Sequence, residues 1–285
     1  METQASLPRQ KGLVLRTEVV GKMDLIHKEV PKEAIQALNL IKEVLENQLV
    51  GVYLYGSAVM GGLRADSDVD ILVLTNGSLS ESARGELAKR LMQISGRSGE
   101  STGIRPVEVT VVNQKDVIPW HFPPKYELMY GEWLREHFER GEIPGATYDP
   151  DLTLLLAQLE KKSIALFGPK IDEVLEPIPW EDIQRAMKDS LPGLIASLKG
   201  DERNVILTLA RMWFTASTGA FSSKDQAAEW AIPQLPEEQA ALLDLARKAY
   251  LGEVKDKWEG METELALLVE SLRGAIETLL QVKAS

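Results

Sequence analysis

Three acidic side chains lie in segments that otherwise have the composition of buried β-strands. Asp68 and Asp70 flank Val69 at the start of VDILVL, and Glu108 interrupts the valines of PVEVTVV. Because side chains alternate between the two faces of a strand, Asp68 and Asp70 point the same way, about 7 Å apart, while Val69 and Ile71 enter the core. Paired carboxylates at this spacing supply the oxygen ligands that Mg²⁺ prefers.

A Gly-Ser turn precedes the two aspartates. Gly56 and Ser57 end the apolar segment LVGVYLYG, and Ser57 stands eleven positions before Asp68. Such a turn can offer backbone N–H groups and a hydroxyl to phosphate oxygens. The GxxxxGK[ST] pattern is absent, so a Walker-type nucleotide site is not supported. The alternative reading of ADSD is an Asx-rich turn, with Asp70 facing the edge of a sheet.

Glu108 shares its strand face with Thr110, whereas the valines of the same segment share the other face. If this strand lies beside the strand of Asp68 and Asp70, three carboxylates converge, and one of them can accept a proton from a substrate. The alternative is a solvated position, because antiparallel sheets commonly have one wet face.

The elements that must position these residues form a mixed region followed by a helical one. Apolar spacing predicts helices over 32–47, 78–95, 125–141 and 149–168, and strands over 49–56, 69–74 and 105–113. Helix and strand alternate over roughly 30–125, which favours an α/β or α+β unit.

The later part of the chain has a helical pattern throughout. Pro177 and Pro179 mark the boundary, and helices are predicted over 180–200, 201–218, 223–231, 236–252 and 261–280. We therefore expect three regions: an N-terminal extension over 1–30, a mixed-sheet domain over 31–176 and a helical domain over 177–285.

Composition excludes several classes of function. The 285 residues include 32 basic and 43 acidic side chains, and a net charge of −11 disfavours a nucleic-acid surface. This negative charge would attract a cationic partner, or it serves only to keep the protein soluble, as in many acidic proteins. No apolar run approaches the ~18 residues of a membrane span, and no secretory signal is recognised, so we expect a cytoplasmic protein. The absence of cysteine excludes disulfides and thiolate metal sites.

The motif segments resemble a known family. GSAVMGGLRADSDVDILVL resembles the nucleotidyltransferase signature of the polymerase-β-like superfamily. The segments EVTVVNQKDVIPWHFPPKYELMYGEWLRE, GDERNVILTLARMW, TGAFSSKDQAAEWAIPQLP and LARKAYLG look like the aminoglycoside nucleotidyltransferases that adenylylate spectinomycin and, in one branch, also streptomycin. The resemblance runs from about Ala34 to the last helix. It implies an α+β fold, in which a nucleotidyltransferase domain with a mixed β-sheet precedes a C-terminal α-helical bundle.

The resemblance also implies a reaction. Asp68 and Asp70 would hold Mg²⁺ against the phosphates of ATP while a substrate hydroxyl attacks the α-phosphorus and pyrophosphate leaves. Glu108 matches the position of the family's catalytic base and contacts the substrate. Gly56, Ser57 and Ser67 would lie near the triphosphate.

In the helical domain, Lys224 is predicted in the first turn of a helix in which Ser223 and Gln226 have capping-box spacing. A cation there opposes the helix dipole unless an anion lies between them. The resemblance places Lys224 on the triphosphate, and a solvated lysine is the alternative. Arg211 and Tyr250 match further nucleotide-contacting positions.

Two more residues match the drug site of the family. The resemblance assigns Asp201 to the amines of the drug, whereas the residues alone predict a helix N-cap after Gly200. The two roles are compatible, because a cap uses one oxygen. Trp133 would line the aminoglycoside cleft, whereas its pattern predicts the buried side of an amphipathic helix.

Two positions depart from the two-drug branch. Ser197 replaces an aspartate, and losing that carboxylate removes a charge-assisted contact to a guanidinium-bearing drug, typically worth about 1.5 to 3 kcal/mol. Asn204 replaces a histidine whose role stays open. We therefore expect a monomeric enzyme that uses MgATP to adenylylate the 9-hydroxyl of spectinomycin, with streptomycin a poor substrate. The alternatives are a dual streptomycin 3''/spectinomycin 9 adenylyltransferase and a non-catalytic nucleotide-binding relative.

Overall fold

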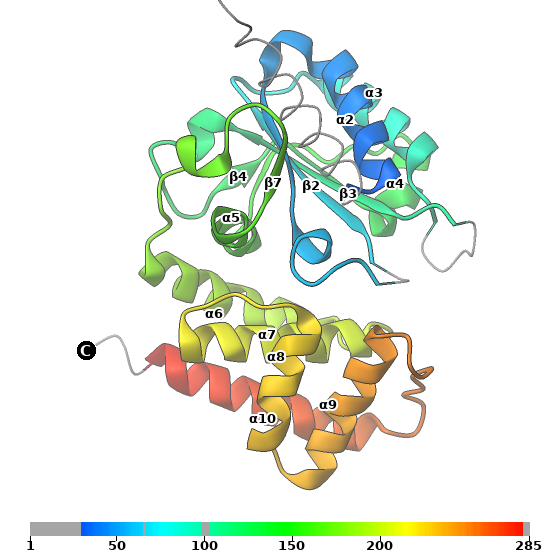
Figure 1. The fold of residues 1–285 in the computed structure, drawn as a ribbon, viewed down its shortest axis with the longest axis vertical. Helices are drawn as coiled ribbons and strands as arrows, with labels where there is room; N and C mark the ends of the chain where they lie inside the picture. Colours follow the sequence, from blue (N-terminus) through cyan, green and yellow to red (C-terminus); the bar gives the residue numbers. More distant parts are fainter. Residues whose placement is uncertain (1–29, 65–66, 98–102, 282–285) are drawn as a thin grey trace, which may run out of the picture.

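The computed structural model describes residues 30–64, 67–97 and 103–281. The expected N-terminal extension therefore lies outside the described residues, except for Val30. The described chain forms a sheet-containing half and an all-helical half, which lie one above the other in Figure 1. An α+β fold with a mixed sheet followed by helices is the fold that the sequence predicts.

A five-stranded mixed sheet forms the framework of the first half. Its strands run in the order β5-β3-β2-β1-β7. Their bounds are β1 (Leu49–Leu54), β2 (Val69–Thr75), β3 (Val107–Asn113), β5 (Leu128–Tyr130) and β7 (Ile164–Phe167). The two central strands β2 and β3 pair in parallel, and the other neighbours are antiparallel. In the parallel register Asp70 is the partner of Glu108.

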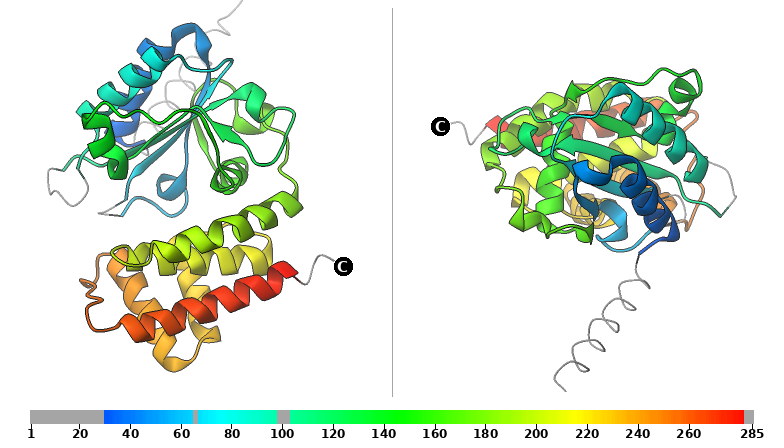
Figure 2. Two further views of the ribbon diagram at one scale, coloured as in Figure 1. Left: turned by 180° about the vertical axis from the view of Figure 1, so that it is seen from behind. Right: turned by 90° about the horizontal axis from the view of Figure 1, so that it is seen from above.

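Helices cover both faces of the sheet, as Figure 2 shows. The helices α2 (Lys32–Leu45) and α3 (Glu81–Ile94) pack on the face that carries Ile71 and Val73. On the opposite face, α5 (Asp151–Lys161) packs in the core that contains Leu72 and Leu74. Both faces of β2 are thus buried beyond Asp70, which explains why the strand reads as an almost continuous apolar run.

The helix predictions for two segments, 125–141 and 149–168, are partly wrong. The segment 125–141 forms β4 (Lys125–Tyr126), β5, the 3₁₀ helix η4 (Glu132–Leu134) and only then α4 (Arg135–Glu139). Leu128 and Tyr130 are fully buried on one face of β5, and pairing with β3 outweighs the local helical spacing.

In the segment 149–168, α5 ends at Lys161, and β7 follows as an edge strand beside β1. Because β1 has a free edge there, the backbone hydrogen bonds of an added strand decide the structure of IALF. The remaining short strand, β6 (Thr147–Tyr148), pairs with β4.

The helical half contains five helices within the described residues. They are α6 (Trp180–Ala196), α7 (Glu202–Thr218), α8 (Lys224–Ala231), α9 (Glu237–Tyr250) and α10 (Glu262–Gln281), close to the predicted segments. Short 3₁₀ helices connect elements at η1 (Glu46–Gln48), η2 (Gly56–Ala58), η3 (Gln114–Asp116), η5 (Ile171–Glu173) and η6 (Ile232–Gln234). Buried side chains of α7 join the same core as the α5 face of the sheet, so the two halves share apolar packing. Within the described residues, no helix is both long and apolar enough to cross a membrane.

Candidate active site

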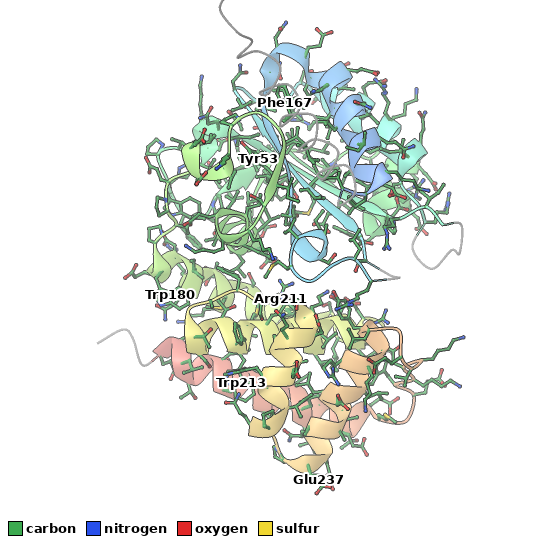
Figure 3. The ribbon with its side chains drawn as sticks, viewed as in Figure 1. Tyr53, Phe167, Trp180, Arg211, Trp213 and Glu237 are labelled. Atoms are coloured by element: carbon green, nitrogen blue, oxygen red, sulfur yellow. The ribbon has the colours of Figure 1, made fainter. Side chains whose placement is uncertain are left out.

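A cleft of about 1180 Å³ lies between the sheet and the helical half. Side chains from both halves converge on it, and Figure 3 shows Arg211 at the boundary between them. All of the site residues expected from sequence line this cleft: Gly56, Ser57, Ser67, Asp68, Asp70, Glu108, Trp133, Asp201, Arg211, Lys224 and Tyr250. The volume exceeds that of a site for one small ligand, which is usually about 300 to 1,000 Å³.

The sheet contributes an acidic wall. Asp70 on β2 lies beside Glu108 on β3, and Asp68 directly precedes β2. Burial, followed by the charge of Asp68, raises the pKa of Asp70 to about 7. Burial, followed by the charges of Asp70 and Asp68, raises the pKa of Glu108 to about 8. The raised values mean that negative charge on this wall is insufficiently compensated, which is what a bound cation relieves.

The donor set fits Mg²⁺ held together with a nucleotide. Within the described ranges, no group of three His, Cys, Asp or Glu side chains is arranged to hold a metal ion. Asp68 and Asp70 are two carboxylates that would hold Mg²⁺, with phosphate oxygens and water as its other ligands. Mg²⁺ is commonly bound in this way, by one or two carboxylates plus substrate phosphates.

The Gly-Ser turn holds Asp70 in place. Gly56 has a φ of +65°, and a Cβ atom on it would lie 1.9 Å from Oδ2 of Asp70. The backbone N–H of Ser57 donates a hydrogen bond to the Asp70 carboxylate, and the N–H of Tyr55 donates to the Asp70 carbonyl at 3.1 Å. The N–H of Ser57, a phosphate donor in the sequence-based prediction, thus donates to the Asp70 carboxylate and orients it.

Ser67 belongs to an anchored loop on the same wall. Its hydroxyl accepts the backbone N–H of Arg64 at 2.9 Å, and its carbonyl accepts the Arg105 guanidinium at 3.1 Å. Ser67 also hydrogen-bonds Tyr250 of α9, and thereby links the sheet half to the helical half. A second link, which sequence analysis missed, is the ion pair of Arg64 with Asp225 of α8 at 3.3 Å. No local sequence pattern predicts this ion pair, because its two residues are 161 positions apart.

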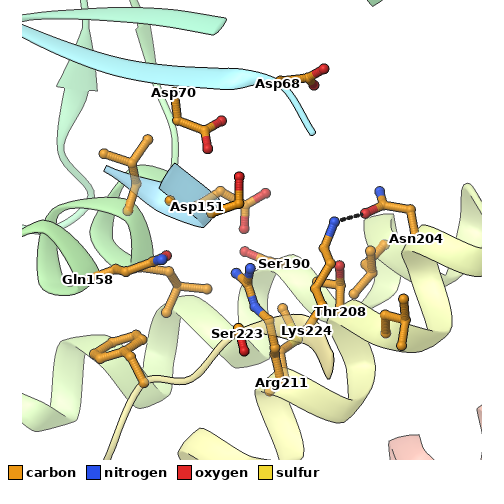
Figure 4. A pocket seen from close by; sticks show the side chains of 18 of the residues that line it. Asp68, Asp70, Asp151, Gln158, Ser190, Asn204, Thr208, Arg211, Ser223 and Lys224 are labelled. Atoms are coloured by element: carbon orange, nitrogen blue, oxygen red, sulfur yellow. Dashed lines mark hydrogen bonds between the residues drawn. The ribbon is translucent and has the colours of Figure 1, made fainter. Parts of the chain in front are cut away.

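The helical half contributes a basic wall. Arg211 on α7 points toward Asp70 in Figure 4, and Lys224 at the start of α8 reaches Asn204 beside it. Burial lowers the pKa of Arg211, and burial together with the nearby Arg211 lowers the pKa of Lys224 to about 8. Two half-buried cations thus lie on this wall, and a polyanion would favour their charged forms.

Two serine hydroxyls beside the N-terminus of α8 have no hydrogen-bond partner among the described residues. They belong to Ser222 and Ser223, and both oxygens are buried. Ser223 is the N-cap residue of α8, as its sequence predicts, but its side chain makes no cap hydrogen bond. Because buried hydroxyls are normally paired, these two donors fit an anion at the helix N-terminus. The Ser-Ser pair before the helix was the available sequence signal, and sequence analysis read Ser223 only as a cap.

The cleft is also lined by the residues expected to meet the drug. Asp201 is the N-cap residue of α7, yet its side chain does not cap the helix and instead accepts Nδ2 of Asn204 at 2.9 Å. Trp133 lies on η4 with 57% of its surface exposed, so the prediction of a buried helical tryptophan is wrong and its indole is free to line the cleft. Ser197 also lines the cleft and is exposed, and its hydroxyl donates to the carbonyl of Leu194 at 2.8 Å.

Comparison with known proteins matches both halves. A family model described as polymerase beta, nucleotidyltransferase matches residues 39–119, and one described as aminoglycoside adenylyltransferase, C-terminal domain matches residues 173–274.

Named relatives cover most of the chain. A spectinomycin 9-adenylyltransferase of Staphylococcus aureus is 55% identical over 257 residues, which are 90% of this chain and 99% of the relative. A protein of the same name from Campylobacter jejuni is 49% identical over 255 residues, covering 90% and 98%. An aminoglycoside (3'') (9) adenylyltransferase of Escherichia coli is 40% identical over 250 residues, covering 87% and 95%.

A solved structure has the same arrangement of elements. It is the crystal structure of the spectinomycin adenyltransferase AAD(9) from Enterococcus faecialis with ATP and spectinomycin, and it matches with a TM-score of 0.83 and 34% identity. The match covers 87% of this chain and all of that one. The similarity therefore extends over the sheet, the cleft and the helical half together.

Proposed function

The chain belongs to the aminoglycoside adenylyltransferase family, and from this premise we propose that it transfers AMP from ATP to the 9-hydroxyl of spectinomycin, releasing pyrophosphate. One observation carries the proposal: a single cleft has an acidic wall at Asp70 and Glu108 and a basic wall at Arg211 and Lys224. Opposed walls of this kind suit a metal-bound triphosphate, because the metal meets the carboxylates and the phosphates meet the cations.

The acidic wall provides the proton acceptor. Glu108 would accept the proton of the attacking hydroxyl, whose oxygen then bonds to the α-phosphorus as the bond to pyrophosphate breaks. Asp68 and Asp70 would hold Mg²⁺, which when bound offsets charge on the phosphate oxygens. Relief of the repulsion between Asp70 and Glu108 would also favour the ionised form of Glu108, the form that can accept a proton.

The basic wall receives the triphosphate. Arg211 and Lys224 supply the charge, and the free hydroxyls of Ser222 and Ser223 supply hydrogen bonds. Tyr250, which contacts Ser67, closes this side of the cleft. Because a nucleotide touches both walls, it draws the two halves together, and we propose that ATP binds before the drug.

The drug would occupy the end formed by Asp201 and Trp133. An exposed carboxylate can bind the amines of an aminocyclitol, and an exposed indole offers it an apolar wall. We also propose that the enzyme acts as a monomer in the cytoplasm, because one chain forms the whole described cleft and ATP is available there.

The product identifies the reaction. The chain is incubated with MgATP and spectinomycin, and the modified drug is analysed by mass spectrometry and by phosphorus-coupled NMR. We expect one added AMP group on oxygen 9. A product adenylylated at another oxygen would contradict the stated regiochemistry.

A second function is suggested by the relatives that act on two drugs. The Escherichia coli relative bears the name aminoglycoside (3'') (9) adenylyltransferase. Ser197 argues against streptomycin as an equal substrate here, because its exposed hydroxyl cannot replace a carboxylate opposite a guanidinium group. A non-catalytic role is disfavoured, since Asp68, Asp70 and Glu108 all line the cleft.

A further inference from the structure

Asn204 lines the cleft and lies between Lys224 and Asp201, with a hydrogen bond to each. Its Oδ1 accepts a hydrogen bond from Nζ of Lys224, drawn as a dashed line in Figure 4. Its Nδ2 donates to Oδ2 of Asp201 at 2.9 Å. Lysine can only donate and a carboxylate can only accept, so the two partners fix the orientation of the amide between them.

The amide separates two charges that each have another task. Under the proposed function, Lys224 and Arg211 would bind the triphosphate, and Asp201 would bind the drug. If Lys224 and Asp201 formed a direct ion pair, each would neutralise the charge that its ligand needs. A neutral bridge leaves both charges available and still fixes the distance between the groups.

Both hydrogen bonds of Asn204 leave room for a ligand at each end. The Lys224 ammonium has three donors, so it can bond a phosphate oxygen and keep its bond to Asn204. The Asp201 carboxylate has two oxygens, so it can accept a drug amine and keep its bond to Nδ2 of Asn204. A ligand that immobilises one end therefore immobilises the other end through the same amide.

We propose that Asn204 is a positioning residue that couples nucleotide binding to drug binding by holding Lys224 and Asp201 in one hydrogen-bonded chain. This inference rests on the proposed function. The second ligand meets a group whose freedom is already lost, so it binds more tightly, and the effect has the same size in either order of addition.

The coupling is measured by calorimetry on the full chain. The dissociation constant of spectinomycin is determined with and without the Mg²⁺ complex of α,β-methylene-ATP, which resists adenylyl transfer. The ratio of the two constants is the coupling factor, and the reverse titration, of nucleotide with and without spectinomycin, should give the same factor. We expect the wild-type protein to bind the second ligand about fivefold or more tightly. Asn204→Leu, which keeps the branching and the number of side-chain heavy atoms but loses both hydrogen bonds, should bring this ratio of dissociation constants close to one.

Three further variants distinguish a lost hydrogen bond from a folding defect. Asn204→His should restore most of the factor, because a neutral imidazole also has one acceptor and one donor nitrogen. Asn204→Asp keeps an acceptor for Lys224 but repels Asp201, so it should lower the factor. Gln234→Leu is the matched control: it removes an exposed amide that donates to the carbonyl of Trp230 at 2.9 Å, away from the cleft, and should keep the wild-type factor.

The outcomes separate this inference from the proposed function. If spectinomycin binds and Asn204→Leu keeps the full wild-type factor, the role of Asn204 is contradicted while the enzyme assignment stands. If wild-type protein binds both ligands with no coupling, the inference also fails. If wild-type protein does not bind spectinomycin at all, the proposed function itself fails.

Discussion

The Asp70 carboxylate occupies the space that a side chain at Gly56 would need. An added Cβ would lie 1.9 Å from Oδ2 and 2.7 Å from Cγ of Asp70, and Gly56 has a left-handed φ of +65°. Glycine is therefore required at position 56 for two separate reasons, the backbone conformation and the close approach of Asp70. The turn and the carboxylate form one unit, although 14 positions separate them in the chain (70 − 56).

Gly56→Ala should abolish most activity. The added methyl must push the Asp70 carboxylate away from the metal position, and a misplacement of about 1 Å can lower turnover by about 100-fold. The left-handed backbone should also lower the free energy of unfolding by about 1 to 2 kcal/mol. Drug-dependent pyrophosphate release and a thermal melt measure the two effects.

Gly219→Ala separates these effects. Gly219 has a φ of +73° at the C-cap of α7, and a Cβ there would contact nothing within 4 Å. This variant should lose similar stability and keep its activity. If both variants lose activity equally, the contact of Gly56 with Asp70 is not what matters.

Glu108→Gln should lower turnover by roughly 100- to 10,000-fold, because the amide has nearly the same size but cannot accept the proton. The affinity for MgATP should be retained, since the substitution removes a negative charge beside Asp70 rather than a phosphate ligand. Calorimetry measures the affinity and pyrophosphate release measures turnover. Near-normal turnover would exclude Glu108 as the base.

MgATP affinity should fall as the pH rises through about 8. Lys224, whose pKa is lowered to about 8, is an ammonium below that pH and neutral above it. The triphosphate binds the ammonium form, so binding takes up a proton near this pH, and affinity falls by up to about tenfold per pH unit above it. Calorimetric titrations on both sides of pH 8 measure the change.

The variant Lys224→Arg tests whether Lys224 causes this pH dependence of MgATP affinity. The guanidinium does not lose its proton in this range, so the dependence should disappear. A fall in affinity that persists in this variant would show that Lys224 is not its source. Ionisation of Glu108 with rising pH favours the bound cation and so acts in the opposite direction.

Asp201→Ala should weaken spectinomycin binding more than nucleotide binding. Removing a charge-assisted hydrogen bond to an amine costs about 1.5 to 3 kcal/mol, which corresponds to about 10- to 150-fold in affinity. The side chain makes no cap hydrogen bond to α7, so stability should change little. Unchanged affinity for the drug in calorimetry would remove Asp201 from the drug site.

Much of this site could be predicted from sequence because its residues follow local rules. Alternation along a strand placed Asp70 opposite Ile71, and the same rule placed Glu108 beside Thr110. The parallel register of β2 and β3 then brings the acids together. Helix boundaries in the second half followed apolar spacing and Gly or Pro punctuation, within a few residues.

What could not be predicted depends on partners far away in the chain. Strand β7 forms because it pairs with the otherwise free edge of β1. Strand β5 likewise pairs with the free edge of β3. The bond of Lys224 to Asn204 and the ion pair of Arg64 with Asp225 join segments that no local spacing relates. The resemblance places Trp133 at the cleft, whereas the helical spacing of its segment predicts a buried side chain; that spacing is misleading because η4 follows β5 and leaves the indole exposed.

The most direct test measures pyrophosphate release by the full chain with MgATP and either spectinomycin or streptomycin. We expect rapid release with spectinomycin, and about 10- to 100-fold lower kcat/KM with streptomycin, because Ser197 offers no carboxylate to its guanidinium groups. Ser197→Asp should raise the streptomycin value. Equal turnover of both drugs would contradict the role given to Ser197, and no release with spectinomycin would contradict the proposed function.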